Sequence, residues 1–291
     1  MSEPKGRVAV WTEERRRSDE GRQRLKAARR RAGPTLHAEW TKLRTVSGPA
    51  WLLAGTVVLI VAVSAAATAA VKCPSGTACA VDTPKLSLTG IEFGQAVVAI
   101  LAVLVISGEY STGMIRITLT AMPHRSAVLA AKAVIVAGLV LAAGTIAVGG
   151  SLLAGRVILP GHGFTPGRGF PLLSLTDTPT LRAAVGSVLY LALIALLSLG
   201  IATIVRESAV AIGGVLGLLY LSPIIISVVA GDPVWSHRLE RYAPMSAGLT
   251  IQDTTGLRGL PISPWGGLGV LAAWAAAAML VGGLALRLRD A

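Results

Sequence analysis

Apolar residues in this chain are gathered into six long runs, and polar residues fill the segments between them. The runs cover residues 50–71, 91–107, 133–155, 183–205, 209–230 and 266–286. Each is close to the about 17–25 residues that an α-helix needs to cross a hydrocarbon layer about 30 Å thick. Because lipid offers the backbone no hydrogen-bond partner, such runs must form helices. The pattern therefore predicts an all-α fold, a polytopic membrane protein with six transmembrane helices.

Composition supports this prediction. Hydrophobic residues make up 53% of the chain and charged residues only 14%, whereas soluble domains carry about 25% charged residues. The first run follows a long polar segment and exceeds the about 7–15 apolar residues of a secretory signal. A cleaved signal peptide is therefore not expected.

Residues 1–33 form a basic leader that contains 11 of the 27 Lys and Arg residues. Such a segment has too little apolar content to bury a core, and we expect it to be disordered on the cytoplasmic side. Anionic lipids at the cytoplasmic face are the expected partner. Nucleic-acid binding is not expected, because no aromatic platform or helix-turn-helix pattern accompanies the charge. The remainder, 34–291, is predicted to be one six-helix domain.

An amphipathic segment over 34–46 precedes the first run. Its apolar face carries Leu36, Trp40 and Leu43, and its polar faces include Lys42 and Arg44. This spacing is typical of a short helix that lies in the membrane interface. The alternative is a polar continuation of the first span. Ser47, Gly48 and Pro49 are expected to break the helix there, which favours the interfacial helix.

An even number of spans places both termini on one side of the membrane. With the termini in the cytoplasm, 19 of the 27 Lys and Arg residues lie inside, as the positive-inside rule favours. Without residues 1–33 the count is 8 against 8. We expect a multi-pass plasma-membrane protein with cytoplasmic termini, and much of the charge argument depends on the leader.

The two cysteines, Cys73 and Cys79, lie in the same loop, 72–90, which this orientation places outside. An oxidising compartment would close them into a small disulfide ring. Two free thiols are the alternative. Metal ligation is disfavoured because no further Cys or His lies nearby in the sequence.

The loop 108–132 is short and unusually apolar for a solvated connection. Met114, Ile115 and Leu119 are prominent among its apolar residues, and a short helix over 112–121 would present them together. They could contact a partner surface or pack beneath the bundle at the interface. The residues alone favour neither interpretation.

Several chemistries are missing from the sequence. It has no phosphate-binding loop, since Gly-Lys occurs nowhere, and no His-Glu-x-x-His pair. We therefore expect neither an enzyme nor a bound cofactor or metal. Glu92 and Lys132 fall at span ends, and no ionisable residue falls near the middle of a span, which disfavours ion coupling. The spans also offer no polar constellation that would select a sugar, peptide, lipid or drug as the substrate.

Two stretches carry a resemblance to a known family. Residues 36–45, Leu-His-Ala-Glu-Trp-Thr-Lys-Leu-Arg-Thr, precede the first span. Residues 108–125, Gly-Glu-Tyr-Ser-Thr-Gly-Met-Ile-Arg-Ile-Thr-Leu-Thr-Ala-Met-Pro-His-Arg, follow the second. With six spans, they resemble an ABC transporter permease of the ABC-type-2 exporter family in its actinobacterial form, over about residues 35–291. The basic leader is a departure from the shorter members.

The resemblance implies roles for both stretches. The first would be the N-terminal elbow helix, with Leu36, Trp40, Lys42, Leu43 and Arg44. The second would contain a coupling helix that docks on a separate ABC ATP-binding subunit, through Glu109, Tyr110, Met114, Ile115, Arg116, Leu119 and Arg125. The resemblance also implies a permease homodimer or heterodimer, and re-entrant helices within 231–265. The alternatives are a non-transporting six-span protein, such as a sensor or immunity factor, and an ATP-independent carrier.

Overall fold

The computed structural model describes residues 47–74, 79–111, 125–229 and 233–288. All regular structure in these ranges is helical. The long helices are α2 (Ser47–Ala70), α4 (Ile91–Ser111), α6 (Arg125–Ile158), α7 (Thr178–Val205) and α12 (Pro264–Leu288). A sixth rod consists of α8 (Ser208–Leu216), the π-helical η3 (Gly217–Leu221) and α9 (Ser222–Val229).

Short helices lie between the rods. They are α3 (Thr83–Ser87), η1 (Leu159–His162), η2 (Pro166–Arg168), α10 (Pro233–Tyr242), α11 (Pro244–Leu249), η4 (Thr250–Gln252) and η5 (Leu257–Gly259).

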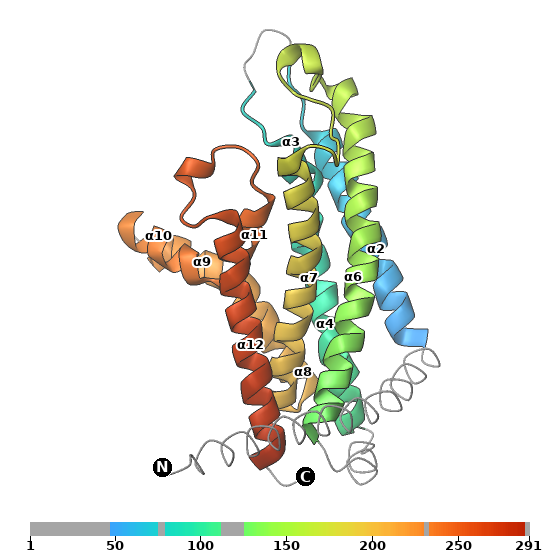
Figure 1. Ribbon diagram of the computed structural model, residues 1–291, viewed down its shortest axis with the longest axis vertical. Helices are drawn as coiled ribbons and strands as arrows, with labels where there is room; N and C mark the ends of the chain where they lie inside the picture. Colours follow the sequence, from blue (N-terminus) through green and yellow to red (C-terminus); the bar gives the residue numbers. More distant parts are fainter. Residues whose placement is uncertain (1–46, 75–78, 112–124, 230–232, 289–291) are drawn as a thin grey trace, which may run out of the picture.

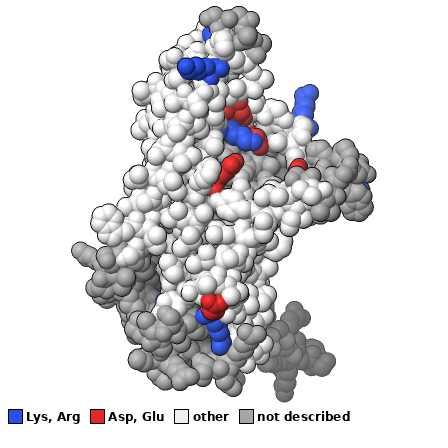
Figure 2. Space-filling model, turned by 180° about the vertical axis from the view of Figure 1, so that it is seen from behind, with Lys and Arg blue, Asp and Glu red and all other residues white. Residues whose placement is uncertain are grey.

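Six helical stretches in the described ranges are long and apolar enough to cross a membrane. They are Ala50–Ala70, Ile91–Gly108, Val128–His162, Thr178–Val205, Ser208–Ile226 and Pro264–Leu286. In Figure 2, one face of the molecule is uncharged over wide areas, with charged side chains gathered in its upper half and near its lower end. The predicted fold class is confirmed, and the protein is a multi-span helical membrane protein.

Two boundaries differ from the expected ones. The third run was expected at 133–155, but α6 spans Arg125–Ile158, so Lys132 is a buried residue of this helix and no part of a loop. The first span was expected to begin at residue 50, after a helix break at 47–49, whereas α2 begins at Ser47 and includes these three residues. Proline is compatible with a first helical turn, because the backbone N–H that it lacks would have no partner within the helix there.

Helix α7 lies at the centre of the bundle, in contact with α4, α6, α8 and α12 (Figure 1). Its fully buried residues include Tyr190, Leu191, Ile194, Leu197 and Leu199. Gly200 lets α12 approach closely, since an added Cβ would lie 2.6 Å from the backbone carbon of Ala278. Small residues at helix contacts are the usual means of close packing in lipid.

The two ends of the bundle are distinct in Figure 1. The upper end carries α3 and the segments that follow α2 and α6, and the lower end carries the turn between α7 and α8. Helix α6 has 34 residues, or about 51 Å at 1.5 Å per residue. It therefore extends well beyond a hydrocarbon layer of about 30 Å.

The short helix α11 packs back against the bundle, in contact with α12 and α7. Its Pro244, Ala247 and Gly248 are buried, as is the whole of η4. Gly267 of α12 permits this packing, because a Cβ there would collide with the carbonyl oxygen of Ala247. The backbone of α11 and η4 is thus covered by protein, as a membrane environment requires of backbone outside a long helix.

We predict that Gly267→Ala destabilises the folded chain by about 1–3 kcal/mol, because the methyl group must push α11 away from α12. Gly269→Ala is the matched control, since its added Cβ would meet no atom within 4 Å. Thermal unfolding of both variants in detergent, followed by near-UV circular dichroism, measures the difference. Equal midpoints would show that the packing of α11 contributes nothing to stability.

Candidate functional site

The upper end is held together first by a disulfide between Cys73 and Cys79. The backbone N–H of Cys73 donates to the carbonyl of His162 at 2.9 Å. The Arg168 guanidinium donates to the carbonyls of Cys73 and Pro74 at 2.8 and 2.9 Å. The segment after α2 is therefore attached to the segment after α6.

The carboxylate of Asp82 forms a second connection. It caps α3 by accepting from the backbone N–H of Lys85. It also accepts from the backbone N–H and the hydroxyl of Thr254, at 2.6 and 2.7 Å. Thr255 donates through the same two groups at 2.9 and 3.2 Å. Asp82 thus joins the segment between α2 and α4 to the segment before α12.

These hydrogen bonds set the ionisation of Asp82. Partial burial alone would raise the pKa of this carboxyl, but the bonds from Thr254, Lys85 and Thr255 outweigh it and lower the pKa below the ordinary value of 3.8. Hydrogen bonds to a charged group favour the charged form. Asp82 is therefore a fully bonded carboxylate with a structural role.

Asp253 adds two more links at the same place. Its carboxylate forms a salt bridge with Lys85, with 2.6 Å between Oδ1 and Nζ. Its backbone carbonyl accepts a hydrogen bond from the guanidinium of Arg182 near the start of α7. Three separate parts of the chain are thereby fixed to one another at the upper end.

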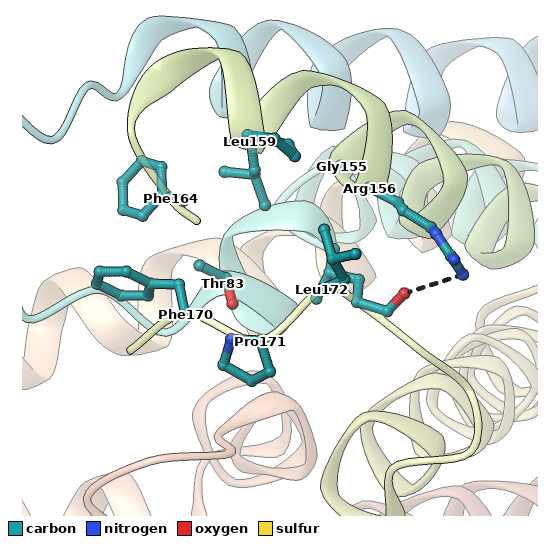
Figure 3. A pocket seen from close by; sticks show the side chains of 10 residues that line it. Thr83, Gly155, Arg156, Leu159, Phe164, Phe170, Pro171 and Leu172 are labelled. Atoms are coloured by element: carbon teal, nitrogen blue, oxygen red, sulfur yellow. Dashed lines mark hydrogen bonds between the residues drawn. The ribbon is translucent and has the colours of Figure 1, made fainter. Parts of the chain in front are cut away.

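A small pocket lies between the upper end of α6, the segment after it, and α3 (Figure 3). Phe164 and Phe170 meet edge to face there, with ring centroids 5.0 Å apart. The Arg156 guanidinium donates to the carbonyl of Leu173 at 3.5 Å. The Arg156 side chain is therefore hydrogen-bonded to the pocket wall, and the other lining residues are mainly apolar. We interpret this pocket as packing of the upper end.

A polar cluster lies deeper, between α4 and α7. Gln95 and Tyr190 are both completely buried. The Tyr190 hydroxyl donates to the side-chain oxygen of Gln95. The Gln95 amide donates to the carbonyl of Glu92 at 3.1 Å and to the sulfur of Met245 in α11 at 3.4 Å. The amide and hydroxyl therefore satisfy each other, as burial demands.

The cluster extends to the fifth span through the π-helical segment. Tyr220 lies in η3 and is half-buried, and its hydroxyl donates to the carbonyl of Glu92. Single π turns are frequent at functional sites. The cluster thus draws on α4, α7, η3 and α11, four elements that are distant in sequence.

We define the polar cluster as Glu92, Gln95, Tyr190, Tyr220 and Met245. The sequence predicted no polar constellation in the spans that would select a substrate, and it did not predict these hydrogen bonds between helices. These residues are scattered singly through apolar runs, and none is conspicuous alone. The missed signal was Gln95, since an amide inside a predicted span needs a partner from another helix.

Gln95 and Tyr190 are fully buried and bonded to each other, so within the cluster only the partly buried Glu92, Tyr220 and Met245 can contact a ligand. Among the residues that the structure describes, no group of three or more His, Cys, Asp or Glu side chains comes together as a metal site would require. Nothing in the cluster resembles a nucleophile paired with a base.

The residues predicted to couple to an ATPase lie at the lower end or outside the described ranges. Glu109 and Tyr110 belong to the last turn of α4, and Arg125 is the first residue of α6. Met114, Ile115, Arg116 and Leu119 lie outside the described residues. The structure places the last residue of α4 and the first residue of α6, which flank this segment, at the same end of the bundle (Figure 1).

The predicted elbow helix, with Leu36, Trp40, Lys42, Leu43 and Arg44, also lies outside the described residues, as does the leader 1–33. Comparison with protein-family models gives no match for this chain, and comparison with curated proteins gives none. The interpretation of the site therefore depends on its own geometry and on the sequence.

We predict that Asp82→Asn lowers stability by about 1–3 kcal/mol at pH 7, since a neutral amide cannot accept all of these hydrogen bonds. The pKa of Asp82 is lowered by folding, so its contribution is present above about pH 4 and is lost as pH falls through the folded-state pKa. Unfolding midpoints of both proteins should therefore converge in acid. Asp177→Asn is the control, because Asp177 is exposed and its side chain does not cap α7.

We predict that Cys73 and Cys79 resist alkylation by a maleimide until the protein is reduced, because their sulfurs are joined. Mass spectrometry of protein labelled in intact cells, with and without reductant, measures this. Ready labelling without reductant would show two free thiols.

Proposed function

We propose that this chain is the membrane-spanning permease subunit of an ATP-driven exporter of the ABC-type-2 family. In this proposal it transmits the motions of a separate ATP-binding subunit to a translocation path. The observation that carries it is the arrangement of six spans with two short helices, α10 and α11, between the fifth and the sixth. The resemblance of residues 36–45 and 108–125 to the family agrees with that arrangement.

The lower end fits a docking surface for the ATP-binding subunit. Helix α4 ends there and α6 begins there, so both attachment points of the apolar segment 112–124 lie at this end. The sequence contains no phosphate-binding loop of its own. A partner that binds ATP would thus supply the energy, and Met114, Ile115 and Leu119 would contact it.

Orientation follows from the same proposal. The lower end would face the cytoplasm, where ATP is available, together with both termini. The upper end, with its disulfide, would face the oxidising exterior. Two permease copies, or one with a close relative, would enclose the path, and the buried α11 would close it from outside.

The test is co-purification with the ATP-binding protein encoded by a neighbouring open reading frame. We predict that Met114→Asp or Ile115→Asp reduces the co-purified ATPase at least tenfold, because a carboxylate in an apolar contact loses its hydration. Leu257→Asp is the control, since Leu257 is an exposed apolar residue of η5 at the upper end.

Membrane insertion of the variants is checked by their yield in the membrane fraction. Unchanged co-purification of the Met114 and Ile115 variants would contradict the docking assignment. ATP hydrolysis or transport by the purified chain alone would contradict the division of labour itself.

A further inference from the structure

Two carboxylates near the upper end have opposite surroundings. Asp82 accepts hydrogen bonds from Lys85, Thr254 and Thr255. Glu92, in the first turn of α4, is half-buried, and among the described residues none donates a hydrogen bond to its carboxylate. The Asp82 carboxylate is thus occupied by hydrogen bonds within the fold, whereas the Glu92 carboxylate can still accept them.

The charge of Glu92 is also poorly matched within the described part of the chain. Lys85 is the cation that attracts it. However, the Lys85 ammonium is already 2.6 Å from the carboxylate of Asp253. The start of a helix favours a nearby carboxylate only weakly. A partly buried carboxylate with this little compensation within the described part of the chain would be stabilised by an external cation.

The surroundings of Glu92 suit an apolar cation better than a hydrated ion. The hydroxyl of Tyr220 bonds to the Glu92 carbonyl, which brings its half-buried ring to the same turn of α4. Aromatic rings attract ammonium groups through their faces. Phe93 and Leu221, the next residues along each helix, are both 53% exposed. They provide apolar area for the rest of a ligand.

The polar cluster also holds Glu92 in place. Gln95 and Tyr220 both donate to its backbone carbonyl, and the Tyr190 hydroxyl donates to the side-chain oxygen of Gln95. The turn that bears the carboxylate is therefore anchored to α7 and to the π-helical segment.

We infer that Glu92 and Tyr220, two half-buried members of the polar cluster, bind an ammonium group carried on an apolar body, with Glu92 as the counter-charge and Tyr220 as an aromatic wall. This inference rests on the proposed function in so far as it makes such a cationic amphiphile the exported substrate class. The same chemistry occurs in phosphatidylcholine, whose headgroup carries a quaternary ammonium. Binding itself requires neither ATP nor the ATP-binding subunit.

The experiment measures binding of the cationic dye rhodamine 6G to the purified full chain in dodecyl maltoside by fluorescence polarisation. We predict that Glu92→Gln weakens binding at least tenfold and that Glu92→Asp, which keeps the charge, weakens it less than threefold. Glu207→Gln is the control, because Glu207 caps α8 at the opposite end. Size-exclusion chromatography shows that each variant is folded.

A competition arm identifies the occupant. Displacement of the dye by dihexanoyl phosphatidylcholine, but not by dihexanoyl phosphatidylglycerol, would support the ammonium site and assign it to lipid. Lack of displacement by both would support it as a substrate site. Equal dye affinity of the wild-type chain and Glu92→Gln, or equal binding of the anionic dye fluorescein, would overturn the inference. Neither result depends on co-purification of the ATPase.

Discussion

The absence of water in a lipid bilayer is the constraint on which this structure depends. Six apolar helices satisfy their own backbone groups, and backbone that folds back among them must be covered by protein. Helix α11 and η4 illustrate this, since they lie between α7 and α12. Glycines at the contacts make this packing possible, because they let two backbones lie closer together than a Cβ atom would allow.

Much of the architecture could be predicted from the sequence, because long apolar runs have one stable form in lipid. The boundaries were less predictable. Helix α6 begins eight residues before the apolar run does, at Arg125, and it includes the buried Lys132. Hydropathy places a lysine outside a span, whereas contacts between helices decide whether its stem can be buried.

The candidate site could not be predicted in the same way. Gln95 and Tyr190 are 95 residues apart in the sequence, and only the packing of α4 against α7 brings them together. The disulfide pairing was one of two interpretations that the sequence left, whereas the link from Arg168 to the carbonyls of Cys73 and Pro74 had no sequence signal. Backbone acceptors are the same for every residue type, so they leave no pattern to detect.

The π-helical segment in the fifth span has a consequence for how this rod can change. A π turn holds one residue more than an α turn within about the same rise. Removing a single residue from 217–221 would let the rod continue as an ordinary helix with α9 facing the bundle almost as before, because a π turn and an α turn each complete one revolution. A deletion in a regular part of the rod would instead rotate everything beyond it by about 100°. The fifth span can therefore carry one surplus residue here without turning α9 and α10 away from their present contacts.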